Sequence, residues 1–402
     1  MYEKDHPEAL RDAAVGERAI EDGKEGQYDG ATHPVRVASY NVNALRKIEY
    51  EPVRPNEDSD PERMRRYKMA NTLYDAYHHI YSFRARKFRI FSDIHYLRNE
   101  REAVDLLAFQ EVPADHAKSV QDYLDYLGLN SECISYNATE GAFCHIIAYD
   151  KERFEKTSDV EIIYLTPSGQ ASTVLGRTHN CGTIAGRCVP VCTFLDKETD
   201  AVFKFASVHF GVEQQHRDEA TEKLCNALPD DGVPMIMAGD YNRFMQTEFG
   251  VYEPQCERLR EAGFTEADRP QITFWPNPYD VDRHLLSEER NDLNRLLEAG
   301  DVSAVRAFFL AVSERLGASA GSPPLDAIFT RNATQIGPTQ VMGFCDGVPV
   351  HSTTQEQLSI HASRQQQLDE PSFDSDHMLI LAKFTLPTAT PNARSSAQTQ
   401  RG

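Results

Sequence analysis

The chain has 402 residues, and its hydrophobic and charged fractions, 40% and 26%, are those of a globular protein with a sizeable core. Asp and Glu outnumber Lys and Arg by 62 to 42, which gives a formal net charge of −20. A field of that sign repels polyanions, so it excludes a protein that coats DNA non-specifically, but not an enzyme that holds cations at its site. The length fits one large α/β domain or about two to three smaller ones.

The sequence gives no sign of a membrane span or an export signal. It lacks a run of about 18 apolar residues, and its first 30 residues contain no apolar stretch typical of a secretory signal. The eight cysteines are scattered without a CxxC pair, which favours reduced thiols over disulfides or structural zinc. We therefore expect a cytoplasmic or nuclear protein.

Composition divides the chain into three parts. Residues 1–33 are polar and acidic, and residues 387–402 are polar with few apolar side chains. Segments of this kind bury too little apolar surface to fold, so we expect a mobile leader and a disordered tail. Residues 34–386 are expected to form the structured region, with inserts at about 50–100 and 277–322.

Eight short apolar runs predict buried strands, and helical patterns separate some of them. Helices are expected at 116–128 and 214–228, and a helical hairpin at 291–317, which Gly300 interrupts and Asp301 caps. Strict strand–helix alternation is not maintained, so a layered α/β sandwich is favoured over a simple doubly wound sheet. The expected strands are 35–40, 104–109, 144–149, 188–194, 202–208, 234–239, 325–329 and 378–384.

Polar side chains that suit a metal or a phosphate recur at the ends of these strands. A sheet fixes such groups in place while the adjacent loops leave room for a substrate. Any one of them alone is more often part of a solvated loop, but their recurrence against apolar strands favours a functional site. The other histidines, His145 among them, have no spacing that indicates metal and are interpreted as surface or packing residues. The recurring groups are Asn41, Asn43, Gln110, Glu111, His209, Asp240, Asn242, Asp326, Asp376 and His377.

Six segments carry a resemblance to a known family. SYNVNALRK, LLAFQEV, SVHF, GDYNRF, LDAIFT and SDHMLI, in this order, resemble the endonuclease/exonuclease/phosphatase (DNase I-like) superfamily from Val35 to Phe384. The resemblance implies an α/β fold, a four-layer sandwich of two packed mixed β-sheets flanked by helices. It also implies a phosphoric ester hydrolase that depends on a divalent metal, usually Mg²⁺, for which Mn²⁺ can substitute.

The same resemblance implies a metal site. Glu111 matches the family's metal-binding Glu, and Asn43 and Asp376 match residues near the metal. Mg²⁺ prefers oxygen ligands and takes only one or two carboxylates, which suits this set. Asn41 matches a residue that orients the phosphate or Glu111, although an Asn at a strand end also forms local turns.

Five further residues match catalytic positions of the family. Asp240 would activate or orient the attacking water, and Asn242 would hold a phosphoryl oxygen. Asp326 would accept a hydrogen bond from His377, whose other ring nitrogen would face the phosphate. His209 would stabilise phosphoryl charge or serve the leaving group, and it counts against the exonuclease-III-like branch. The general base is either Asp240 or His377.

A basic segment bears on the substrate. Residues 61–101 hold ten basic and four acidic side chains together with eight Tyr or Phe residues. Basic residues interleaved with aromatic residues grip phosphates and stack bases, so Arg84, Arg86 and Lys87 are candidate substrate contacts. An amphipathic helix with a solvated basic face explains the pattern equally well. Arg187 is either a phosphate contact or part of a structural salt bridge.

Three functions remain open at this point. The first is a nuclease acting on RNA or DNA, including a deadenylase-like one, so that nucleic acid is the favoured partner. The second is a phosphatase or phosphodiesterase on a small or lipid-linked phosphate, such as an inositol phosphate or sphingomyelin. GDYNR resembles inositol polyphosphate 5-phosphatases, but PPLDAIFT replaces their usual Pro-x-x-x-Asp-Arg signature. The third, a non-catalytic binding module, is disfavoured because none of the expected polar residues is missing.

Overall fold

The computed structural model of the chain describes strands and helices between His33 and Pro387. The described residues are 33–42, 61, 64–65, 67–69, 71–72, 83–99, 103–136, 143–165, 173–174, 177–178, 187–211, 214–242, 254–268, 285–305, 307–308, 311–312, 325–345, 348–351 and 379–387.

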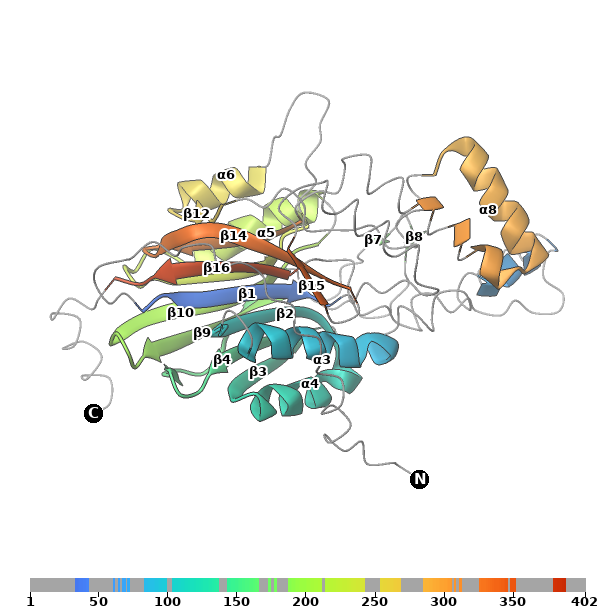
Figure 1. Ribbon diagram of the computed structural model, residues 1–402. Helices are drawn as coiled ribbons and strands as arrows, with labels where there is room; N and C mark the ends of the chain where they lie inside the picture. The colour runs from blue at the N-terminus through green and yellow to red at the C-terminus, as the bar shows by residue number, and fades with distance from the viewer. Residues whose placement is uncertain are drawn as a thin grey trace. The chain divides into compact units, whose positions relative to one another are not determined.

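Seven strands form the first sheet (Figure 1). Its two central strands, β1 (Val35–Asn41) and β2 (Leu106–Pro113), run parallel, and every other neighbouring pair in it is antiparallel. The order across the sheet is β15 (Val348–His351), β14 (Thr334–Cys345), β16 (Leu379–Thr385), β1, β2, β4 (Phe143–Asp150) and β3 (Leu129–Tyr136).

The second sheet also has seven strands and a parallel pair inside it. That pair is β10 (Ala201–His209) and β11 (Met235–Asp240). The order across this sheet is β12 (Thr265–Glu266), β13 (Asp326–Arg331), β11, β10, β9 (Cys188–Asp196) and β5 (Phe154–Lys156), and β6 (Glu161–Tyr164) also pairs with β9. A separate pair is formed by β7 (Thr173–Val174) and β8 (Arg177–Thr178).

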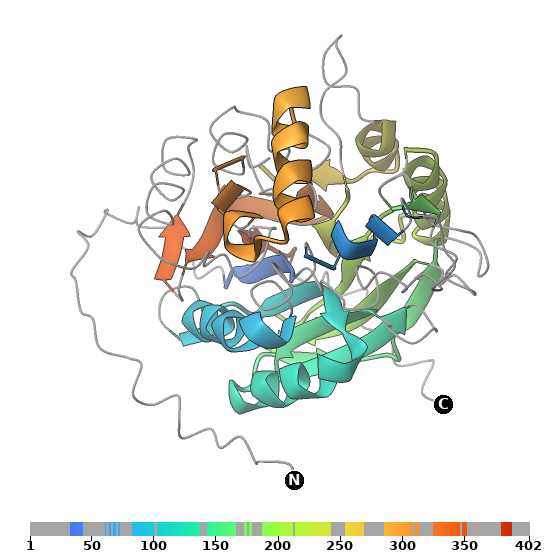
Figure 2. The ribbon, with the colours of Figure 1, turned by 90° about the vertical axis from the view of Figure 1, so that its right-hand side faces the viewer.

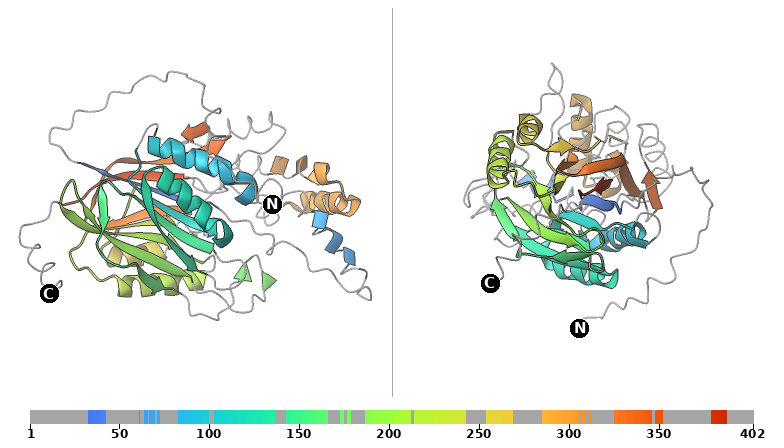
Figure 3. Two further views of the ribbon diagram at one scale, coloured as in Figure 1. Left: turned by 90° about the horizontal axis from the view of Figure 1, so that it is seen from below. Right: turned by 90° about the vertical axis from the view of Figure 1, so that its left-hand side faces the viewer.

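Helices cover the outer faces of both sheets, as Figures 2 and 3 show from different sides. The first sheet carries α3 (Phe83–Asn99) and α4 (Ala114–Tyr126), and the second carries α5 (Gln214–Ala227) and α6 (Pro254–Glu261). A further helix, α8 (Ser287–Ala299), ends at Gly300 with φ 70°. The backbone N–H of Ala304 donates to Asp301 Oδ1 at 3.0 Å, which confirms the predicted cap.

Three apolar clusters correspond to the three interfaces between the four layers. Successive strand residues point to opposite faces of a sheet, so each central strand feeds two clusters. On β1, Val35 and Val37 join the cluster between the sheets, whereas Ala38 and Tyr40 join the cluster under α3 and α4. The predicted four-layer sandwich is therefore confirmed.

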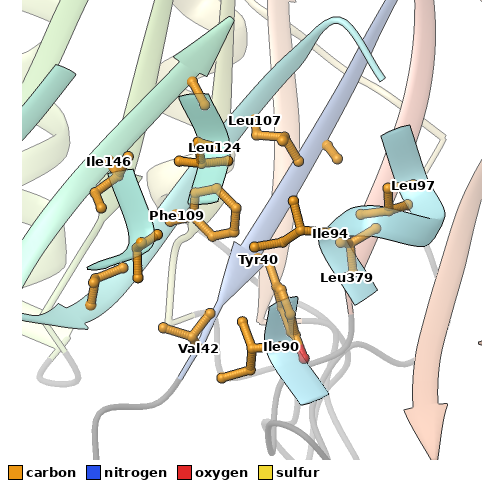
Figure 4. Packing of buried hydrophobic residues seen from close by; sticks show 14 of the residues in the cluster. Tyr40, Val42, Ile90, Ile94, Leu97, Leu107, Phe109, Leu124, Ile146 and Leu379 are labelled. Atoms are coloured by element: carbon orange, nitrogen blue, oxygen red, sulfur yellow. The ribbon is translucent and has the colours of Figure 1, made fainter. Parts of the chain in front are cut away.

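Figure 4 shows the apolar cluster through which α3, a helix of mixed polarity, packs against the first sheet. Tyr40 and Val42 lie beside Ile90 and Ile94 of the helix, and all four side chains are buried. The Tyr40 hydroxyl also donates to Asp93 Oδ2 at 3.3 Å, so a buried carboxylate of the helix has a hydrogen-bond partner. This packing anchors the strand that leads to Asn41.

Two further findings concern the cysteines and the helices. Six cysteines have side chains that the structure describes, and these six are free thiols. Among the helices of the described part of the chain, none is long and apolar enough to cross a membrane.

Candidate active site

The candidate site lies at the ends of strands, on the same faces of the two sheets that form the apolar core between them. On β11, Ile236 and Ala238 belong to the core between the sheets, and Asp240 follows two residues later. Asn41 stands in the same relation to Val37 on β1, with Ser39 between them. Because side chains alternate along a strand, residues two apart share a face, and both polar groups therefore point into the layer between the sheets.

Strand register brings three of the predicted residues side by side. His209 of β10 pairs with Asp240 of β11, and Asp240 pairs with Asp326 of β13. All three are at most 2% exposed. Neighbouring strands lie about 4.8 Å apart, so these side chains form one row at the end of the second sheet.

Gly239 allows the close approach of the two strands that carry His209 and Asp240. A Cβ at this position would lie 2.0 Å from the carbonyl oxygen of Val208 and 2.7 Å from its carbon. Both are backbone atoms, which cannot move away as a flexible side chain can. The requirement for glycine in the GDYN segment is therefore steric.

Glu111 reaches the site through an irregularity in β2. By alternation it would share the outer face of Leu107 and Phe109. The β2–β4 register instead shifts between Phe109 and Val112, and Glu111 has a φ of 57°. Such bulges re-aim side chains, and a left-handed conformation of a non-glycine residue is typical of functional positions.

The two carboxylates meet at one amide nitrogen. Asn41 Nδ2 donates to Glu111 Oε1 at 3.2 Å and to Asp240 Oδ2 at 3.0 Å. His209 Nε2 lies 3.5 Å from the same Glu111 oxygen and 3.6 Å from the same Asp240 oxygen. Glu111 belongs to the first sheet and Asp240 to the second, so Asn41 links the sheets at this point.

This arrangement fits a divalent cation. Glu111, His209 and Asp240 each offer one ligand atom, and these atoms lie within 4.8 Å of one another. The carboxylate of Asp240 is buried and that of Glu111 is half-buried, so the two repel each other, and a cation between them removes the repulsion. Carboxylate oxygens and imidazole nitrogen are established ligands of divalent metals. The donor set therefore suits a metal ion in chemistry and in spacing.

Asn242 holds Asp240 in place from the adjoining turn. Its backbone N–H donates to Asp240 Oδ1 at 2.7 Å, and its Nδ2 donates to the carbonyl of Phe210 at 2.7 Å. Asn242 has a φ of 48°, a conformation that Asn tolerates better than most residues. With Oδ1 fixed in this way, Oδ2 of Asp240 is the oxygen directed at Asn41 and His209.

Arg187 lies next to the site. It is half-buried, and its Nη1 is 3.5 Å from the backbone carbonyl oxygen of His209, to which it donates. This contact places a permanent positive charge beside the row of His209 and Asp240. A phosphate contact by Arg187 remains a prediction.

The basic helix α3 differs from one expectation. Arg86 was expected to contact substrate, but its side chain is 1% exposed and its Nη1 donates to the Val42 carbonyl at 3.0 Å. Arg86 thus braces the end of β1 from inside the protein. Lys87 is half-buried with its Nζ 5.0 Å from the centre of the Phe88 ring, and the side chain of Arg84 lies outside the described part of the chain.

Three predicted site residues fall outside the described ranges: Asn43, Asp376 and His377. The expected pair of Asp326 and His377, and the expected metal contacts of Asn43 and Asp376, therefore remain predictions.

Sequence reasoning missed two buried polar residues that lie between the sheets next to the site, His145 and Ser207. His145 was interpreted as a surface or packing residue, yet it is fully buried and its Nδ1 lies 2.9 Å from Ser207 Oγ. Burial, aided by the charge of Arg187, lowers the pKa of His145 to about 3, against a hydrogen bond to the Cys188 backbone that raises it. The alternation of side chains along a strand could have revealed Ser207, because it lies two residues before His209 and therefore on the same face.

Comparison with known proteins identifies the fold. No protein-family model and no curated protein matches the chain. Among solved structures, an endonuclease/exonuclease/phosphatase family protein from Bacteroides thetaiotaomicron matches with a TM-score of 0.51 at 13% identity, covering 89% of this chain and 100% of that one.

Two other solved structures are similar over comparable lengths. The human Nocturnin catalytic domain matches with a TM-score of 0.46 at 15% identity, covering 88% of this chain and 95% of that one. A mannosyl-6-phosphatase from Bacteroides thetaiotaomicron VPI-5482 matches with a TM-score of 0.48 at 13% identity, covering 88% of this chain and 100% of that one.

Proposed function

Because the chain has the fold of the endonuclease/exonuclease/phosphatase proteins, we propose that it is a divalent-metal-dependent hydrolase of phosphate esters. A fold alone hosts many functions, so the proposal depends on the site. The observation that carries it is the meeting of Glu111, Asp240 and His209 around the side-chain amide of Asn41. A buried carboxylate beside a half-buried one is typical of sites that bind a cation or transfer a proton.

Glu111 is the first candidate to hold the metal, with Asp240 and His209 within reach of the same point. Asn43 and Asp376 are further candidates from the sequence. When bound, Mg²⁺ or Mn²⁺ would neutralise charge on the phosphoryl oxygens and make a bound water more acidic. An imidazole nitrogen beside the carboxylates suits Mn²⁺ better than Mg²⁺, which prefers oxygen ligands.

The residues of the chain would divide the proton transfers between them. Asp240 has one oxygen fixed by the Asn242 backbone, so its other oxygen is placed to accept a proton from the attacking water. Where Glu111 and Asp240 hold the metal without it, a protonated His209 would donate a proton to the departing oxygen or stabilise phosphoryl charge. Asp326, next to Asp240 in register, would orient His377, which is the alternative general base.

For the substrate we propose a phosphodiester of nucleic acid. Sugar alkoxides are poor leaving groups, so their departure needs a proton donor such as His209. A small phosphate ester is the second candidate, and two observations favour it. Arg86 is buried, so the described part of the basic segment presents fewer exposed charges to a polynucleotide than the sequence predicts. The net charge of −20 acts in the same direction.

A substrate panel tests the proposal. Purified protein would be assayed with Mg²⁺ and with Mn²⁺ on single-stranded RNA, single-stranded DNA, inositol phosphates and sphingomyelin. We expect turnover that a chelator abolishes. Cleavage confined to the polynucleotides would support the nuclease, and cleavage confined to the small esters would support the second candidate. Absence of turnover on every substrate, with partner binding retained, would instead favour a binding module.

Two substitutions test the assigned residues. Glu111→Gln removes a negative ligand and is expected to weaken Mg²⁺ binding, measured by calorimetry. His377→Ala is expected to lower kcat by about 10²- to 10⁴-fold without loss of the fold, because that is the usual contribution of a general acid or base. The exposed Glu155 supplies a control, since Glu155→Gln should change neither quantity. Near-normal turnover in His377→Ala would refute its assignment.

A further inference from the structure

A second row of polar residues lies beneath part of the candidate site. Ser39 precedes Asn41 by two residues on β1, and Ser207 precedes His209 by two on β10, so each shares its face. Both serines are at most 1% exposed. Beneath Asp240 the corresponding residue is Ala238, which is apolar. The polar row therefore underlies only the part of the site that carries Asn41, Glu111 and His209.

Hydrogen bonds join this row across the two sheets. Gln110 accepts from Ser39 Oγ at 3.3 Å, and its Nε2 donates to the Ala108 carbonyl at 3.2 Å and to Ser207 Oγ at 3.0 Å. Ser207 Oγ lies 3.4 Å from the Phe109 carbonyl, to which it donates. A buried amide with its donors and its acceptor engaged in this way has one orientation.

His145 completes the row from β4. Its Nδ1 shares a hydrogen bond with Ser207 Oγ at 2.9 Å. Its ring meets that of His209 edge to face, with the ring centres 6.4 Å apart and the planes at 76°. His145 therefore contacts the site histidine directly and the hydroxyl that lies two residues before that histidine.

We infer that Gln110, Ser207 and His145 are positioning residues that hold Glu111 and His209 in the geometry that the site requires. This inference rests on the proposed function. Glu111 has a left-handed backbone conformation inside a bulge, and such conformations persist only where the surroundings determine them. Gln110, the residue immediately before it, provides that constraint through three hydrogen bonds.

Ser207→Ala and Gln110→Leu test the inference by two readouts, Mn²⁺ affinity and the separate values of kcat and KM. We expect each variant to bind Mn²⁺ about 10- to 100-fold more weakly, as loss of an outer partner of a metal ligand usually does. We expect kcat to fall by a similar factor with KM changed less, because the residues do not touch substrate. Ser207→Thr keeps the hydroxyl and should retain most of both values.

Thr221→Val is the matched control. Thr221 is fully buried in α5 and donates through its hydroxyl to the Arg217 carbonyl at 2.7 Å. The substitution deletes one buried, hydrogen-bonded hydroxyl, as Ser207→Ala does, but in the outer layer. It should lower the thermal midpoint while leaving Mn²⁺ affinity and kcat near those of the wild type.

The outcomes separate this inference from the proposed function. If the wild type binds Mn²⁺ but hydrolyses no phosphate ester, weaker Mn²⁺ binding in Ser207→Ala still supports the positioning role. If both variants lose stability yet keep Mn²⁺ affinity and kcat, the row is only structural and the inference is overturned. A wild type that binds no Mn²⁺ overturns both proposals. If Ser207→Ala does not fold, His145→Asn, measured by the same readouts, decides.

Discussion

Burial of His145 predicts that the protein loses stability as the pH falls below about 6.5, the ordinary pKa of histidine. In the folded chain the pKa of His145 is lowered to about 3. Between these two values the unfolded chain binds a proton at this residue and the folded chain does not. Protons therefore favour the unfolded state over that range, and stability rises with pH across it.

The size of the effect follows from the same two values. Each pH unit within the window changes the free energy of unfolding by about 1.4 kcal/mol, so lowering the pH from about 6.5 to about 5 removes about 2 kcal/mol. Against a total stability of about 5–15 kcal/mol, this is a large fraction. Other groups also titrate in this range, so the His145 contribution has to be isolated by substitution.

His145→Gln provides that comparison, because glutamine does not titrate and its amide can hydrogen-bond Ser207. Urea unfolding followed by circular dichroism would give the free energy of unfolding of both proteins at about pH 7.5, 6.5 and 5. We expect the wild type to lose about 2 kcal/mol more than the variant between the lower two values. Above about pH 6.5 the two curves should run parallel. Parallel curves down to pH 5 would refute the reasoning.

Two further substitutions test the framework of the fold. Arg153 is 7% exposed and forms ion pairs with Asp105 at 3.0 Å and Asp196 at 2.9 Å. Arg153→Met leaves both carboxylates buried without this cation, so it should lower the free energy of unfolding, measured by urea titration, by about 3–5 kcal/mol. Gly239→Ala forces a Cβ against the Val208 backbone and should cost about 1–3 kcal/mol or more, seen as a lower thermal midpoint together with reduced turnover. Unchanged midpoints would contradict the respective argument.

The strands that the sequence predicted are those whose residues are both apolar and buried. The eight apolar runs all coincide with strands, because central strands of a sandwich bury both faces. Strand β14 was missed, since Gly337 and Pro338 interrupt it and its register with β16 shifts between Ile336 and Gln340. The alternating pattern that identifies a strand is lost at such a shift.

Buried polar residues limited the prediction of α3. The helix buries Arg86 and Asp93 along with Phe83, Ile90 and Ile94, so hydropathy alone cannot identify its inner face. Arg86 was consequently interpreted as a candidate substrate contact. Long polar side chains are buried when a partner satisfies them, here the Val42 carbonyl for Arg86 and the Tyr40 hydroxyl for Asp93.

Within the site, the sequence predicted the polar groups at strand ends but not the hydrogen bonds behind them. Asn41, His209 and Asp240 follow apolar runs directly, and alternation alone gives their direction. The contact between Gln110 and Ser207 crosses from one sheet to the other, and no spacing along the chain reveals such a contact. Glu111 was also found at a strand end, although its direction depends on a bulge that hydropathy does not show.

The antiparallel pairing of β1 with β16 has a consequence for folding. Val35 lies opposite Phe384, so the pair joins segments that are far apart along the chain. Because the entropy of closing a long loop opposes such a contact, we expect this pair to form late during folding. Until it forms, one edge of β1, the strand that ends at Asn41, is open to pairing with other strands.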